Sequence, residues 1–198
     1  MISTSNGIGS YAEIARRPLK ADSCALIVVD IQERLVPAIY EKERVLRNAQ
    51  LLLRLAQTFS LPVIATTQYA RGLGATTPEV AALLPDANVM DKMTFGCFGH
   101  EPFAAAVKEL PTGRNTLIVC GIEAHICVQQ TVLAALDRGY LVHLAADAVS
   151  SRTEQNWRFA LERMKDAGAV IAPTETIIYE LLHRCDTPAF KEMLKHLK

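Results

Sequence analysis

Short apolar runs alternate along the chain with segments whose apolar residues recur at helical spacing. Residues 25–30 read ALIVVD, and from Val45 to Phe59 the apolar side chains return every three or four residues. The same alternation continues towards the end of the chain. Strands that are apolar at nearly every position are typical of parallel sheets covered by helices on both faces. The pattern therefore predicts an α/β fold with right-handed crossover connections.

The alternation also predicts where the elements lie. Strands are expected at 25–30, 62–67, 88–93, 116–120, 141–146 and 169–172. Helices are expected at 45–59, 80–84, 102–110, 125–138 and 154–167, followed by two short helices. Thr76 and Glu79 are placed to form a capping box before the second helix, and Gly139 to end the fourth. We predict a single three-layer domain with a mainly parallel six-stranded sheet over residues 21–198, preceded by a leader of residues 1–20.

Charge and cysteine content limit the classes of partner. Lys and Arg together number 21, as do Asp and Glu, and this balance disfavours nucleic acid or a membrane surface as a partner. The first residues lack the apolar stretch of a signal peptide, and no run reaches the roughly 18 apolar residues of a membrane helix. We therefore expect a cytoplasmic protein. Five cysteines without a CxxC pair fit neither a disulfide framework nor a cysteine-rich zinc site, and we interpret them as free thiols.

Three reactive side chains fall at the carboxyl ends of predicted strands. Asp30 ends the first strand, Lys92 lies near the end of the third, and Cys127 follows the fourth through the turn GIEAHIC. Ligands bind beyond the carboxyl ends of strands in a parallel sheet, so this fold would gather the three residues at one rim. Taken singly, such an Asp is commonly a helix cap, such a Lys a surface charge and such a Cys a buried apolar residue. Their joint order indicates a catalytic trio.

Cys127 is the candidate nucleophile of this trio. It lies in the first turn of a predicted helix, where unpaired N–H groups and a partial positive potential favour a thiolate. A cationic Lys92 nearby would act in the same direction, so we expect the pKa of the thiol to be lowered. Asp30 would take the thiol proton and return it to a leaving group. N–H groups of the turn would stabilise an oxyanion.

Three local sequences resemble those of a known family. VVDIQ, DKMTFGCF and CGIEAHICVQQTVLAALDRGY resemble the motifs of the isochorismatase-like cysteine hydrolases, and the resemblance extends over roughly residues 21–180. It implies the Rossmann-like, isochorismatase-like fold. It also implies that Asp30 is the acid/base residue, that Lys92 is its electrostatic and proton-transfer partner, and that Cys127 is the nucleophile.

The same resemblance describes the turn before the nucleophile. It implies a cis peptide bond between Ile122 and Glu123, and an oxyanion hole formed by the N–H groups of Glu123 and Cys127. Other side chains near the predicted rim are candidate substrate-binding residues, and for the aromatic ones core packing is an equal alternative. These candidates are Gln32, Gln68, Tyr69, Phe95 and Phe98.

Metal binding distinguishes one branch of this superfamily. Nicotinamidases bind a metal through an Asp-x-His element and further histidines after the second strand, whereas the matching stretch here, TTQYARGLGATTPEV, contains neither His nor Asp. The five histidines show no spacing typical of a metal site, and we interpret His125 and His143 as structural. We predict no metal and no cofactor, and we disfavour nicotinamidase activity.

The presence of Cys127 favours acyl transfer. We predict a metal-independent cysteine hydrolase that cleaves amides of small molecules through a thioester, similar to the isochorismatase domain-containing and YcaC-like branch. Two alternatives stay open: an isochorismatase-type vinyl-ether hydrolase, and a non-hydrolytic binding or redox-sensing protein on the same fold. The helix after Cys127 is apolar on most sides, which indicates burial, in part against another subunit. We therefore expect a homo-oligomer, either a dimer or a tetramer.

Overall fold

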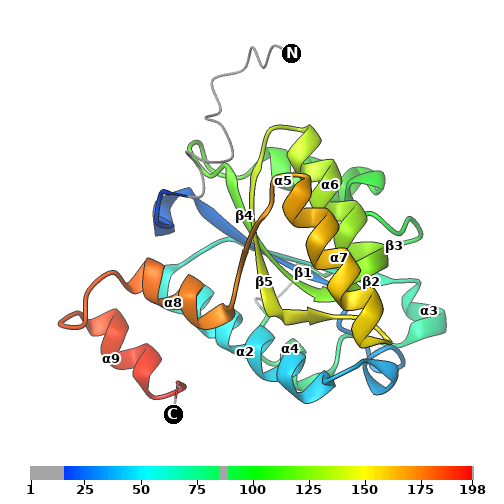
Figure 1. The fold of residues 1–198 in the computed structure, drawn as a ribbon, viewed down its shortest axis with the longest axis horizontal. Helices are drawn as coiled ribbons and strands as arrows, with labels where there is room; N and C mark the ends of the chain where they lie inside the picture. Colours follow the sequence, from blue (N-terminus) through cyan, green and yellow to red (C-terminus); the bar gives the residue numbers. More distant parts are fainter. Residues whose placement is uncertain (1–15, 85–88, 198) are drawn as a thin grey trace.

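A parallel sheet forms the centre of the protein (Figure 1). The structure, a computed structural model, describes residues 16–84 and 89–197. Its six strands follow the order β3-β2-β1-β4-β5-β6, and every neighbouring pair is parallel. The strands are β1 (Cys24–Val29), β2 (Val63–Gln68), β3 (Val89–Lys92), β4 (Thr116–Ile122), β5 (Leu141–Ser150) and β6 (Val170–Ala172). The predicted parallel α/β sheet is confirmed.

Helices cover both faces of the sheet, which gives the predicted three layers (Figure 1). One face carries η2 (Val36–Ala38), α2 (Lys42–Phe59), α4 (Pro78–Ala81), α8 (Thr174–Leu182) and α9 (Pro188–Leu194). The other carries η3 (Cys97–Gly99), α5 (Glu101–Lys108), η4 (Ala124–Val128), α6 (Gln129–Asp137) and α7 (Glu154–Asp166). Two short helices, η1 (Ala21–Ser23) and α3 (Ala70–Leu73), lie in the connections. None of the described helices is long and apolar enough to cross a membrane.

Strand β1 is apolar at every position because both of its faces are buried. Successive side chains of a strand point to opposite faces of the sheet. Leu26 and Val28 enter the core under α2, whereas Ile27 and Val29 enter the core under α5, α6 and α7. Since both faces are covered, neither set of side chains can be polar without a cost in desolvation.

Helix α4 differs from its prediction. Its N-cap is Thr77, whose side chain makes no capping hydrogen bond, and Thr76 instead forms an isolated antiparallel bridge with Gln32. The predicted capping box of Thr76 and Glu79 is therefore wrong. Pro78 explains the difference: proline is favoured at the first helical position, so the helix begins there and Thr77 precedes it.

The described part of the predicted leader contacts the domain. Leu19 is buried in the core, and its backbone N–H donates to Glu180 Oε2 on α8 at 3.1 Å. Residues 1–15 lie outside the described residues. The division into a leader of residues 1–20 and a domain of residues 21–198 stays a prediction.

Gly121 allows β1 and β4 to approach closely where both strands end. It is paired in register with Val29, and it has a φ of +125°. A Cβ at this position would lie 2.0 Å from the Val29 carbonyl oxygen, which is far inside van der Waals contact. Only glycine therefore fits between Asp30, which follows β1, and the turn that follows β4.

Replacing Gly121 by Ala should destabilise the protein by about 3 kcal/mol or more, because the new Cβ meets backbone that cannot rotate away. Urea denaturation measures this change. Gly113→Ala is the matched control, since Gly113 also has a positive φ but has open space around its Cβ direction. The control should lose only about 1–2 kcal/mol. Equal losses in the two variants would contradict the close approach of the strands.

His143 is a buried histidine of β5. It is 5% exposed, and burial lowers its pKa from 6.5 to about 4. The ring is therefore neutral at pH 7 and serves as packing between strands, as predicted from the sequence. Between pH 6.5 and about 4, the unfolded chain binds a proton at this residue that the folded protein does not bind. Folding stability is therefore fully present above pH 6.5 and falls as the pH decreases through this range.

The pH dependence should weaken when His143 is replaced by Leu. Near pH 5, His143 lowers the free energy of unfolding of the wild type by about 1.4 kcal/mol for each pH unit of further acidification. Between pH 7 and pH 5, wild-type unfolding free energy should fall by about 2 kcal/mol more than that of His143→Leu. Urea denaturation at both pH values tests this, with the exposed His183→Gln as the control that keeps the wild-type dependence. Parallel curves for wild type and His143→Leu would refute the assignment.

Candidate active site

Asp30, Lys92 and Cys127 converge beyond the carboxyl ends of the central strands. Asp30 directly follows β1, Lys92 is the last residue of β3, and Cys127 lies in η4, close after β4. All three are buried, with Asp30 and Lys92 0% exposed and Cys127 6% exposed. Strand β2 separates β3 from β1, so the long lysine side chain is what allows β3 to contribute a charge next to Asp30.

The carboxylate of Asp30 is held at both oxygens. Lys92 Nζ donates to Oδ2 at 2.7 Å, and Thr66 Oγ1 donates to Oδ1 at 2.8 Å. The backbone of Asp30 has a φ of +49°, a left-handed conformation that Asp tolerates better than most residues. This turn carries the side chain out of β1 and onto the rim of the sheet.

The ammonium group of Lys92 is fully occupied by oxygen acceptors. Besides Asp30, its Nζ reaches Gln68 Oε1 at 2.9 Å and the carbonyls of Phe95 at 3.0 Å and Thr94 at 3.2 Å. An ammonium has three N–H donors and no acceptor, so these four oxygens use all of its donors. The buried positive charge is therefore compensated by one carboxylate and by three neutral oxygens.

The two candidate glutamines bind protein groups. Gln32 Oε1 accepts the backbone N–H of Gln68 at 2.7 Å, and its Nε2 donates to the carbonyls of Gln68 and Gly74. Gln68 uses its Oε1 on Lys92 and its Nε2 on the Met93 carbonyl. Both amides thus hold the ends of β2 and β3 beside the trio.

The three candidate aromatic residues lie in different environments. Phe98 is buried, packs edge-on against Phe103 with ring centroids 5.2 Å apart, and lies under the Arg138 guanidinium at 4.9 Å. Tyr69 and Phe95 are 45% and 56% exposed. The structure therefore places Phe98 in the core, and it leaves Tyr69 and Phe95 accessible next to the two strand ends that carry Gln68 and Lys92.

The turn before Cys127 has the backbone that the family resemblance implies. The peptide bond between Ile122 and Glu123 is cis. The residues after it form a π-helical turn, in which Val128 N–H donates to Glu123 O at 3.2 Å. The regular helix α6 begins only at Gln129, so Cys127 lies in an irregular turn rather than in the first turn of an α-helix.

The loop after β5 holds this turn in place, which the sequence did not indicate. Glu123 Oε2 accepts hydrogen bonds from both the backbone N–H and Nε of Arg152, each at 3.0 Å. His125 Nδ1 lies 2.9 Å from Ser151 Oγ, and its Nε2 lies 3.5 Å from Asn156. The ring of His125 thus connects the turn to the loop after β5 and to α7, as expected for a structural histidine.

The thiol of Cys127 differs from its prediction. Burial raises its pKa to about 12, and the charge of the Asp30 carboxylate and a hydrogen bond to it act in the same direction. Lys92 lowers the pKa, but its charge is already paired with Asp30. The expected lowering of the pKa is therefore wrong, and Cys127 carries its proton at neutral pH.

A second thiol, Cys97, lies beside the trio and was not singled out from the sequence. Its Sγ lies 3.6 Å from Thr66 Oγ1, and its backbone N–H donates to Thr131 Oγ1 at 3.0 Å. Thr131 in turn donates to the Cys127 carbonyl at 2.7 Å. Burial raises the pKa of the Cys97 thiol, so it too is a neutral group. A Cys in a GCF tripeptide carries no signal that would have marked it.

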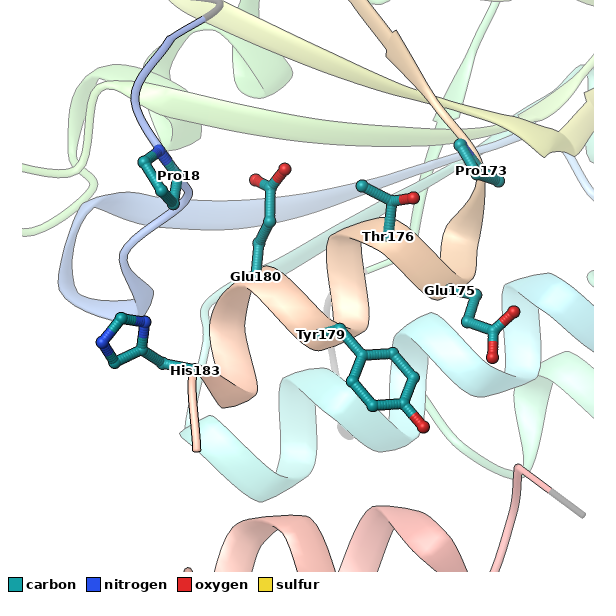
Figure 2. A pocket seen from close by; sticks show the side chains of 7 residues that line it. All are labelled: Pro18, Pro173, Glu175, Thr176, Tyr179, Glu180 and His183. Carbon is teal, nitrogen blue, oxygen red and sulfur yellow. The ribbon is translucent and has the colours of Figure 1, made fainter. Parts of the chain in front are cut away.

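A surface pocket of about 550 Å³ lies away from the trio, along α8. Figure 2 shows its side chains, with Pro18 and His183 towards one end of α8 and Pro173 towards the other. It is lined by Pro18, Pro173, Glu175, Thr176, Tyr179, Glu180 and His183. None of the trio lines this pocket. Within residues 16–84 and 89–197, no group of three or more His, Cys, Asp or Glu residues is arranged to hold a metal ion.

Comparison with known protein sequences identifies isochorismatase proteins as relatives of this chain. The family model of the Isochorismatase domain matches residues 24–176. The secreted isochorismatase effector Isc1 of Phytophthora sojae is 37% identical over 179 residues, which cover 89% of this chain and 85% of that protein. Mouse isochorismatase domain-containing protein 2B is 36% identical over 177 residues, which cover 89% of this chain and 82% of that protein.

Solved structures agree with the sequences. The MAR1 ribonuclease from Caenorhabditis elegans superposes with a TM-score of 0.84 at 34% identity, covering 91% of this chain and 92% of that one. YcaC from Pseudomonas aeruginosa superposes with a TM-score of 0.85 at 27% identity, covering 91% of this chain and 92% of that one. Escherichia coli YcaC, described as an octameric hydrolase of unknown specificity, superposes with a TM-score of 0.84 at 29% identity, covering 90% of both chains.

The fold and the site together define an α/β protein of the isochorismatase-like superfamily. The sequence matches extend over most of the chain, and the chain belongs to the isochorismatase family. The predicted similarity to isochorismatase domain-containing and YcaC-like proteins is confirmed. Membership of this family supports a hydrolase-like function.

The Lys92–Asp30 pair should be required for stability as a unit. Lys92→Met keeps an unbranched side chain but removes its charge and leaves Asp30 as an uncompensated buried charge. We therefore expect the free energy of unfolding to fall by about 3–5 kcal/mol in urea denaturation. The double variant Asp30→Asn/Lys92→Met removes both charges and should be more stable than Lys92→Met alone. Arg158→Met breaks an exposed ion pair with Glu154 and should change stability little. Wild-type stability in Lys92→Met would disprove this coupling.

Proposed function

We propose that this protein is a metal-independent cysteine hydrolase of small molecules, with Cys127 as its nucleophile. The observation that carries the proposal is the fully buried Lys92–Asp30 ion pair next to the Cys127 thiol. Removing two charges from water is costly, and buried charges with a specific partner cluster at functional sites. Both charges act on the thiol of Cys127, which makes it the group that the pair would activate.

In the first half-reaction, Asp30 acts as general base. Because the pKa of Cys127 is about 12, the thiol needs a base at neutral pH, and the adjacent carboxylate takes its proton as Sγ attacks the substrate carbonyl carbon. The S–C bond forms, and the carbonyl π electrons move to oxygen, where the N–H groups of Glu123 and Cys127 stabilise the charge. The adduct then collapses, the C–N bond breaks, and Asp30 protonates the leaving amine.

In the second half-reaction, water replaces the amine. Asp30 removes a proton from the water as its oxygen attacks the thioester carbon, and collapse of this adduct breaks the C–S bond. The departing thiolate of Cys127 receives the proton from Asp30, which restores the starting state. Throughout, Lys92 is the electrostatic and proton-transfer partner, because its charge stabilises Asp30 each time the carboxylate is ionised.

The burial of the trio favours a small substrate. Tyr69 and Phe95 are accessible near the rim and are proposed to contact the substrate, whereas Gln32, Gln68 and Phe98 are proposed to support the site. The amide class is proposed because a thioester route suits acyl transfer. Pseudomonas aeruginosa YcaC, described with covalent acrylamide, supports a reactive nucleophile in a similar structure.

Other functions have less support. Vinyl-ether hydrolysis, which the family's name suggests, gives Cys127 no covalent role. Redox sensing through Cys127 would not require the buried Lys92–Asp30 pair, whereas hydrolysis uses that pair for proton transfer. The C. elegans neighbour is named a ribonuclease, but the zero net charge of this chain supplies little general attraction for RNA phosphates.

We further propose that the protein is a homo-oligomer in the cytoplasm. Escherichia coli YcaC is described as octameric. In the single chain, Leu133 and Leu136 of α6 remain partly exposed, and Phe159 on neighbouring α7 is 60% exposed, so apolar surface is available for contact between copies. Light scattering at micromolar concentration that gave a monomeric mass would exclude the oligomer.

A panel of small amides monitored by intact mass tests the nucleophile. We expect an acyl adduct on the peptide that contains Cys127, and Cys127→Ala should lose the adduct and about a thousand-fold or more of turnover. Cys120→Ala is the matched control, because burial raises the pKa of the Cys120 thiol to about 12 as well, while its side chain lies in the opposite core. Full turnover by Cys127→Ala on any hydrolysed amide would refute the assignment.

A further inference from the structure

Thr66 connects the candidate base to the second thiol of the site. From β2, its Oγ1 donates to Asp30 Oδ1 at 2.8 Å and lies 3.6 Å from Cys97 Sγ. Thr66 is 2% exposed and Cys97 is 0% exposed, so both polar contacts are inside the protein. In such an environment, a hydrogen bond to a charged group is stronger than in water.

The direction of each proton in this chain of contacts follows from the donors available. A hydroxyl has one proton, and an ionised carboxylate can only accept. The Thr66 proton therefore points to Asp30, which leaves the lone pairs of Oγ1 for the S–H group of Cys97. The contacts form a one-way chain in which Cys97 donates to Thr66 and Thr66 donates to Asp30. Hydrogen bonds arranged in this way polarise and strengthen one another.

We propose that Thr66 is a positioning residue that fixes the orientation and the ionised form of the Asp30 carboxylate for proton exchange with Cys127. Lys92 holds Oδ2 and Thr66 holds Oδ1, so the carboxylate cannot rotate without losing a donor. Cys97 supports this arrangement by directing the Thr66 hydroxyl.

The groups that face Asp30 come from four elements. They are Lys92 of β3, Thr66 of β2, Cys97 of η3 and Cys127 of η4. Only Lys92 among them is charged, since both thiols are neutral. The hydroxyl of Thr66 is therefore the one neutral hydroxyl donor to the carboxylate among the described contacts. The inference rests on the proposed role of Asp30 as general base.

Acrylamide labelling of Cys127 tests the inference without a known substrate. The thiol proton leaves Cys127, its Sγ bonds to the terminal alkene carbon, and the proton ends on the carbon next to the amide. Labelling rates are followed by intact and peptide mass between pH 5 and pH 9. Thr66→Val should label about tenfold more slowly at pH 7, the value of one charge-assisted hydrogen bond. Its rate should also rise at a higher pH than that of wild type, because the ionised carboxylate has lost a donor.

Two variants separate positioning from packing. Thr66→Ser restores the hydroxyl and should return the rate and its pH profile to within about twofold of wild type. Thr67→Val is the matched control: the neighbouring Thr67 also donates to a carboxylate, that of Asp91 at 3.1 Å, but this carboxylate is outside the trio. Thr67→Val should label like wild type.

The outcomes are distinct. An unchanged rate and pH profile in Thr66→Val overturns the inference, as does a slower rate with an unshifted profile that Thr66→Ser does not restore. Should Thr66→Val fail to fold, Cys97→Ala serves in its place, because it removes the thiol that directs the Thr66 hydroxyl. Its labelling profile should shift to higher pH by less than that expected for Thr66→Val. An unshifted profile in Cys97→Ala would then overturn the inference. Wild-type labelling in Asp30→Asn would instead refute Asp30 as the base, and with it the proposed function.

Discussion

The buried ion pair between Lys92 and Asp30 determines how the rest of the site is built. Two charges without solvent exposure persist only when every donor and acceptor around them is satisfied. That requirement explains why Gln68, two backbone carbonyls and Thr66 all point at the pair. It also explains why Gln32 is used to hold the end of β2. The surroundings of the trio are thus set by the solvation of its charges.

The positions of the trio could be predicted from the sequence because they depend on order along the chain. Parallel strands share one carboxyl edge, and Asp30, Lys92 and Cys127 each follow or end a predicted strand. The contacts among the three could be expected only in outline. Their distances depend on the close approach of β1 and β4 at Gly121. A glycine at the end of a strand does not indicate in the sequence which part of the backbone it will contact.

The electrostatic prediction was wrong because burial is a property of the folded chain. A helix start and a nearby lysine are visible in the sequence and favour a thiolate, but desolvation outweighs both, and it raises the pKa of Cys127 to about 12. Thr66, Cys97 and the Arg152 loop were missed for a related reason. Such residues carry no local signal, and they matter only because the fold places them against Asp30 or Glu123.

One consequence follows from the position of β3 in the sheet. Among the described residues, this short strand is the outermost of the sheet and pairs only with β2, and its Val89 is 44% exposed, yet it carries Lys92. Marginal strands open by local fluctuations that leave the rest of a domain folded. Fraying of β3 would withdraw the ammonium group from Asp30 while the central strands stay paired. On heating, the contact between Lys92 and Asp30 should therefore be lost below the temperature of global unfolding, with the amides of β3 exchanging with solvent before those of β1 and β4.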